Sequence, residues 1–256
     1  MAPTPRHAAA RTPLSRSFRR VAKHRLAMLL AMEAFAIFGI APLIEVGLLP
    51  HLLLGVTFSL ILLAGMLVLD LRSPTGRVLI LLGASLLPIQ IWRYAWPDEL
   101  VLFIHPLGLI AFLLVLSWSL INEVFRSERI KLDQVLGGVV LYLNIGLTFA
   151  VAYTLVENTV PGAFQMPPPA PDHPIHPSSF TYFSFVTLTT LGYGDIVPVE
   201  AIARSLATLE ASLGQLYPAI ILARLVSIEV SQRDQKPRSK HGQKVAQDLG
   251  GAAGDR

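Results

Sequence analysis

Cysteine is absent from the 256 residues, and only 15% of them are charged. Without cysteine the chain can form neither a disulfide bond nor a thiolate metal site. Because 53% of the residues are hydrophobic, the composition also excludes an ordinary soluble domain, in which about a quarter of the residues are charged. Neither an HExxH motif nor a glycine-rich phosphate loop occurs, so we expect no enzyme and no bound cofactor. The composition indicates a membrane protein.

Long apolar segments occupy most of the chain. They lie at about 26–48, 51–71, 77–96, 99–123, 133–156 and 199–230, and each is close to the roughly 20 residues that a helix needs to cross a bilayer. The intervening region 157–198 is too polar and proline-rich to cross, but 179–190 is apolar enough for a short helix that enters the membrane and stops. Non-helical backbone after such a helix is tolerated where it is buried in protein or lines water. We therefore expect an all-α membrane protein with six transmembrane helices plus a re-entrant helix and loop.

Basic residues gather in the segments that six spans would place on one side of the membrane. That side holds the Lys and Arg of 1–25, Arg72, Arg77, those of 126–135 and those of the C-terminal tail, whereas the other side holds only Arg93 and Arg204. Since loops rich in Lys and Arg stay in the cytoplasm, we expect a multi-pass protein of the cell membrane with both termini cytoplasmic.

Neither end of the chain has the pattern of a folded domain. Residues 1–25 lack apolar periodicity and predict a disordered basic cytoplasmic arm. A signal peptide is the alternative, but the apolar stretch that follows carries Glu33 and does not end at a small-residue cleavage site. The charged tail 231–256 is short for an independent domain, for which roughly 100 residues are typical. The basic ends favour anionic lipid headgroups over nucleic acid as partners.

One loop carries the most specific motif of the chain. It reads Thr190, Leu191, Gly192, Tyr193, Gly194 and Asp195. Glycines at 192 and 194 allow the backbone to enter left-handed regions without steric cost, so that successive carbonyl oxygens can form a column. Such a column, with the Thr190 hydroxyl at its inner end, can replace the water shell of a dehydrated K⁺. The pattern predicts an ion-selectivity filter.

The stretch from about 136 to 230 resembles the two-helix pore module of tetrameric potassium channels, whose filter reads TVGYG. The resemblance implies an outer helix, a pore helix, a filter that binds K⁺ through residues 190–194, and an inner helix. Leu191 replaces the usual Val, and Tyr182 and Phe183 stand where many members have a Trp pair. The Tyr182 hydroxyl is then a candidate brace for Asp195. Since one filter loop cannot surround an ion, a homotetramer with cyclic symmetry is implied.

Gly214 lies twenty-four residues beyond Thr190, where members of that family often place a hinge glycine. Pro218 follows one turn later, and proline inside a helix removes a hydrogen bond and clashes with the preceding turn. We therefore expect a kink near 214–218. It is either a gating hinge or a static packing bend.

The domain 26–125 occupies the position of a voltage sensor but lacks its chemistry. A sensor helix needs a series of Arg or Lys residues that move through the field, whereas 99–123 contains neither. Arg126, Arg129 and Lys131 fit a cytoplasmic linker over 126–135. Strong voltage gating is therefore not expected, and the role of these four helices stays open.

Several ionisable residues have no assigned role. Glu210 lies in the middle of the last span, where a carboxylate is costly. It could bind hydroxyls of the re-entrant helix such as Thr187 or Thr189, supply negative potential to a cavity, or be a protonated structural residue. Glu33 raises the same question. His173 and His176 lie in a proline-rich segment that favours an extended loop, with a metal or pH site as the alternatives.

Together these patterns predict a passive K⁺ channel that needs only K⁺ and the lipid bilayer as partners. A non-selective cation channel or an ion-translocating subunit of a transporter is the alternative. Transporter subunits of that kind usually hold several degenerate loops, whereas this chain has one intact loop.

Overall fold

The computed structural model describes residues 26–46, 48, 52–68, 73–95, 98–126, 132–166 and 177–234. The expected arm 1–25, residues 127–131 of the expected linker, His173, His176 and the tail beyond 234 lie outside the described residues.

The described residues are almost entirely helical, so the expected all-α membrane fold is confirmed. The first helix is α-helical over 26–35, continues as the π-helical η1 (Ala36–Ile40) and ends as α2 (Ala41–Glu45). The helices α3 (Leu52–Val68), α4 (Pro74–Ala95), α5 (Glu99–Arg126), α6 (Leu132–Thr159), α7 (Pro177–Leu188) and α8 (Ala201–Asp234) follow. Two short strands, β1 (Phe164–Gln165) and β2 (Val197–Pro198), pair antiparallel on either side of α7 in the sequence.

Within the described residues, five helical stretches are long and apolar enough to cross a membrane. They are Leu26–Ile44, Pro74–Arg93, Glu99–Asn122, Gln134–Thr159 and Ala201–Ile228. The remaining expected span corresponds to α3, whose 17 residues rise about 25 Å at 1.5 Å per residue. Seventeen residues lie at the lower end of the roughly 17–25 that form a transmembrane helix. Within the described residues, five of the six expected spans are therefore long helices, and the sixth is the shorter apolar helix α3.

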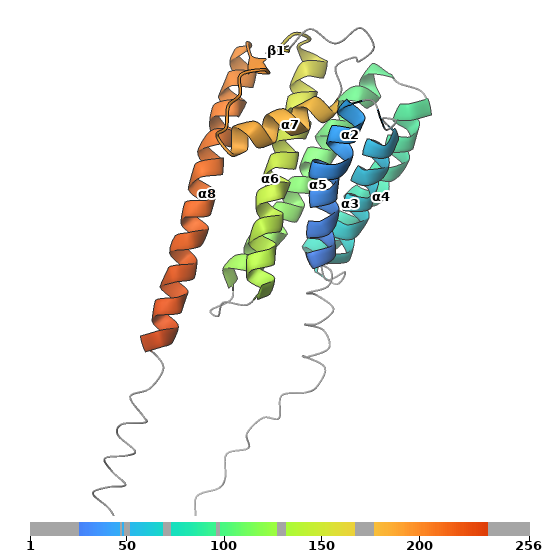
Figure 1. Ribbon diagram of the computed structural model, residues 1–256. Coiled ribbons are helices and arrows are strands. Elements are labelled where there is room, and N and C mark those ends of the chain that lie inside the picture. The colour runs from blue at the N-terminus through green and yellow to red at the C-terminus, as the bar shows by residue number, and fades with distance from the viewer. Residues whose placement is uncertain are drawn as a thin grey trace, which may run out of the picture.

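The long helices run side by side, and α7 lies across them (Figure 1). The first helix, α3, α4 and α5 form one side of the molecule, α6 lies in the middle, and α8 forms the far side. The start of the first helix and the end of α8 lie at the same end of the bundle. The first helix also packs on the re-entrant helix, since the rings of Phe38 and Phe185 are 6.2 Å apart. The N-terminal helices therefore support the region that carries the loop.

An aromatic cluster fixes α7 between α6 and the β1–β2 pair. Phe164 on β1 lies at its centre, with its ring 5.4 Å from Tyr153, 5.0 Å from Phe180 and 5.5 Å from Phe183. All four rings are buried, and edge-on pairs of this kind stabilise beyond the area that they bury. The cluster fixes the position of α7, and the loop starts where that helix ends.

The last helix is left largely uncovered by the rest of the chain. Only 6% of its span is buried, against 56% of the α6 span. Its exposed apolar residues are Ile202, Leu209, Leu213, Leu216, Ile220, Leu222, Val226 and Val230. α8 is continuous through Pro218, and the kink near 214–218 stays a prediction.

Candidate functional site

The loop that follows α7 has an alternating backbone. Thr190, Gly192 and Gly194 have φ angles of 60°, 58° and 79°, and the intervening Leu191 and Tyr193 are not among the described residues with positive φ. Alternation between left- and right-handed conformations aligns successive peptide groups, with N–H on one face and C=O on the other. This backbone can present a row of carbonyl oxygens to a cation.

The loop is attached to the end of α7 through the backbone. The amides of Thr190 and Leu191 donate to the carbonyls of Thr187 and Val186, each at 2.9 Å. Residues 189–195 are exposed in the single chain. Leu191 is 60% and Tyr193 66% exposed, so most of the surface of both side chains is left uncovered by the single chain.

Thr190 is held in an unfavourable backbone conformation. It is the one described non-glycine residue with positive φ, and a β-branched residue there is strained. Its hydroxyl donates to the carbonyl of Thr189 at 2.7 Å and accepts from Nε2 of Gln215 at 2.9 Å. Since a hydroxyl has one hydrogen and two lone pairs, one lone pair of Thr190 remains for an ion. Sequence reasoning missed Gln215, although an amide in a membrane span could have signalled it.

The two tyrosines near the loop stack on each other. The rings of Tyr182 and Tyr193 are 6.5 Å apart and 7° from parallel. Asp195 Oδ1 accepts from its neighbour, the amide of Ile196, at 3.1 Å. Tyr182 thus lies beside the loop as expected, with its ring against Tyr193, and its role as a brace for Asp195 stays a prediction.

Gly214 is the point at which α8 touches the end of α7 backbone to backbone. A Cβ atom at this position would lie 1.8 Å from the carbonyl oxygen of Leu188 and 2.7 Å from its carbonyl carbon. That oxygen also accepts from the Tyr142 hydroxyl at 3.4 Å. Close packing therefore accounts for the glycine, and a hinge role stays a prediction.

Glu210 is completely buried where α8 meets α6 and α7. The hydroxyl oxygens of Tyr153 and Ser184 each lie 2.5 Å from one of its carboxyl oxygens. A hydroxyl bond to the re-entrant helix was one of the alternatives for Glu210, with Thr187 and Thr189 as candidates, and the residue that makes it is Ser184. The Thr189 hydroxyl, just beyond α7, donates instead to the carbonyl of Phe185 on that helix.

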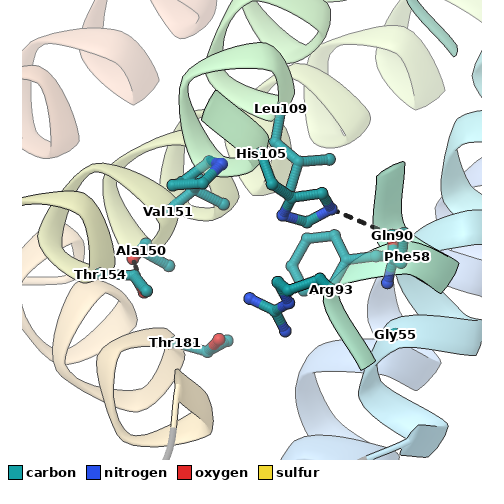
Figure 2. A pocket seen from close by; sticks show the side chains of 11 residues that line it. Gly55, Phe58, Gln90, Arg93, His105, Leu109, Ala150, Val151, Thr154 and Thr181 are labelled. Atoms are coloured by element: carbon teal, nitrogen blue, oxygen red, sulfur yellow. Dashed lines mark hydrogen bonds between the residues drawn. The ribbon is translucent and has the colours of Figure 1, made fainter. Parts of the chain in front are cut away.

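The N-terminal helices hold further buried polar groups. Glu33 is completely buried, and neither carboxyl oxygen has a hydrogen-bond partner among the described residues. Arg93 points into a cavity of about 50 Å³ between these helices, α6 and α7 (Figure 2). His105 Nε2 lies 3.4 Å from Gln90 Oε1 in the same cavity.

A re-entrant helix and a loop whose backbone alternates in φ lie between two long apolar helices. This arrangement defines the pore domain of an ion channel. A family model described as "Ion channel" matches residues 141–230, which span most of α6 through most of α8. Protein LctB of Bacillus caldotenax is 31% identical over 126 residues, covering 47% of this chain and 92% of that protein. Protein LctB of Geobacillus stearothermophilus is 33% identical over 106 residues, covering 41% and 78%.

Inward rectifier potassium channel Kirbac3.1 of Paramagnetospirillum magnetotacticum is 34% identical over 84 residues, covering 31% of this chain and 24% of that one. The chain belongs to the same family as Protein LctB, and its residues 141–230 form an ion channel domain.

Proposed function

We propose that this protein conducts K⁺ selectively and passively across the cell membrane, with residues 190–194 as its filter. The observation that carries the proposal is the alternation of positive φ at Thr190, Gly192 and Gly194. The name of Kirbac3.1, a potassium channel, supports the same ion. No cofactor is needed, because backbone carbonyls replace the water shell of the ion.

The arrangement of one chain supports a homotetramer. One loop offers oxygens from one side only, so a ring of loops is needed to surround an ion. The exposed apolar face of α8 and the exposed Leu191 and Tyr193 are the surfaces that neighbouring copies would cover. Four copies related by cyclic symmetry place the four loops on one axis. In this arrangement both termini lie in the cytoplasm, which agrees with the positive-inside rule.

The reversal potential of the purified protein in a planar bilayer, under opposing K⁺ and Na⁺ gradients, tests the proposal. We expect a value near the K⁺ equilibrium potential, block by Ba²⁺ and little dependence of opening on voltage. Robust current that reverses near zero would instead indicate a non-selective cation pore. A steep voltage dependence with several gating charges would contradict the absence of a voltage sensor.

Gln215→Leu tests the inner end of the filter. Without the amide, the Thr190 hydroxyl loses one partner at 2.9 Å, and a hydrogen bond of this kind contributes about 1 kcal/mol. We expect K⁺ selectivity to persist while the Ba²⁺ concentration for half block from the inside changes about fivefold. Ser212→Ala is the matched control, because that hydroxyl donates to Thr208 O within its own helix at 2.8 Å. Equal Ba²⁺ block in Gln215→Leu and wild type would show that Gln215 does not affect ion binding at the inner end of the filter.

A further inference from the structure

Four polar groups from three helices form one chain of short contacts behind the loop. The Tyr153 hydroxyl of α6 lies 2.5 Å from Glu210 Oε2 on α8, and the Ser184 hydroxyl of α7 lies 2.5 Å from Glu210 Oε1. The same Ser184 oxygen lies 2.7 Å from the carbonyl oxygen of Gly146 on α6. The side chains of Tyr153, Ser184 and Glu210 are completely buried. We call this set the Glu210 cluster.

A hydrogen count determines the protonation of the cluster. Ser184 Oγ lies at hydrogen-bonding distance from both Gly146 O and Glu210 Oε1, but a hydroxyl has one hydrogen and a carbonyl oxygen has none. If Glu210 were ionised, one of the two contacts would place lone pairs against each other. A second hydrogen is therefore needed among these three oxygens, and Glu210 is the group that can supply it.

No counter-charge for an ionised Glu210 lies on the two helices that pack against it. The helices packed against it, α6 (132–159) and α7 (177–188), contain no Lys, Arg or His. Their ionisable groups are Asp133, Tyr142, Tyr153, Glu157 and Tyr182. On α8 the neighbouring basic residues are Arg204, about 9 Å along the axis, and Arg224, about 21 Å along it, at 1.5 Å per residue. A buried carboxylate without a cation is strongly unfavourable, whereas a neutral acid needs only hydrogen bonds.

We propose that Glu210 is held as a neutral carboxylic acid that donates its proton to Ser184, and that this proton links α8 through α7 to α6. Tyr153 donates to Oε2, Oε1–H donates to Ser184 Oγ, and Ser184 donates to Gly146 O, so that every hydrogen has one acceptor. Gly146 makes the approach possible, because a Cβ there would lie 2.6 Å from the Phe185 ring. Glu210 is thus a positioning residue for the helix that carries the loop. The protonation of Glu210 does not depend on which ion passes.

Infrared spectroscopy of the whole channel in lipid at neutral pH tests the protonation directly. The difference between wild type and Glu210→Gln should contain the C=O stretch of a carboxylic acid, and the same difference for the exposed Glu200→Gln should not. Should Glu210→Gln fail to assemble, Ser184→Ala serves instead, since removing the acceptor should shift the acid band. A carboxylate band in place of the acid band in the wild-type difference would overturn the proposal.

Current through the variants provides the second readout. Gln matches the neutral acid, because its amide can donate to Ser184 and accept from Tyr153. We expect single-channel conductance in Glu210→Gln to stay within about twofold of wild type, and Glu210→Leu to lose about tenfold or more of conducting channels, because two buried hydroxyls lose their partner. Were Glu210 instead an anion that attracts cations, Glu210→Gln would lose conductance, and this result would contradict the proposal. A pore that proved non-selective would leave both expectations unchanged.

Discussion

Replacing Gly214 with alanine is expected to prevent the assembly of conducting channels. The added methyl group would lie 1.8 Å from the carbonyl oxygen of Leu188, and a backbone atom cannot rotate away as a side chain can. The Tyr142 hydroxyl also holds this oxygen at 3.4 Å. Overpacking of a core typically costs about 1–3 kcal/mol and occasionally more. Here the strain falls where α8 supports the end of the re-entrant helix. The next residue along α8 is Gln215, which contacts the Thr190 hydroxyl.

The measurement is the oligomeric state in detergent together with the current in bilayers. Gly138→Ala is the matched control, since a Cβ atom there would lie 3.5 Å from the Tyr217 hydroxyl, an ordinary contact. We expect that variant to assemble and conduct like wild type. The hinge hypothesis makes a different prediction, namely that Gly214→Ala assembles normally and changes only the open probability. That outcome would show that α8 can move away from Leu188 and would favour the hinge.

Much of the fold could be predicted from the sequence because its signals are local. The apolar segment 179–190 predicted a re-entrant helix, and α7 covers Pro177–Leu188. The glycines at 192 and 194 predicted left-handed backbone, and both have positive φ. The same reasoning did not predict the positive φ of Thr190, because a β-branched residue disfavours positive φ. Its conformation results from the alternation of the whole loop and its attachment to α7.

The partners of Glu210 could not be predicted, because they depend on the rotation of α8 against α6 and α7. A carboxylate in a membrane span signals a need for hydrogen bonds, and this much was correct. However, Ser184 and Thr187 differ by less than one helical turn, so a small rotation decides between them. Tyr153 lies 57 residues away in the sequence. Gln215 was missed for the same reason, since its amide matters only once its distance to Thr190 is known.

Replacing Gly192 with alanine is expected to abolish selectivity between K⁺ and Na⁺. Gly192 has a φ of 58°, and a side chain in left-handed backbone costs roughly 1–2 kcal/mol per residue. In the proposed homotetramer the cost arises four times around one ion. The strain is relieved when φ becomes negative, and this change breaks the alternation that aligns the carbonyl oxygens of the loop. The ion then loses part of the oxygen shell that replaces its water.

The reversal potential under K⁺ and Na⁺ gradients measures this effect, and we expect it to move toward zero in Gly192→Ala. Gly162→Ala is the matched control, because Gly162 also has a positive φ, 86°, and a Cβ atom there would meet nothing within 4 Å. The control introduces comparable backbone strain in the turn between α6 and β1, far from the loop in sequence. If both variants shift the reversal potential equally, strain alone explains the loss. If Gly192→Ala stays K⁺-selective, residues 190–194 are not the filter, because a filter that works through aligned carbonyl oxygens cannot tolerate a reversed φ at its centre.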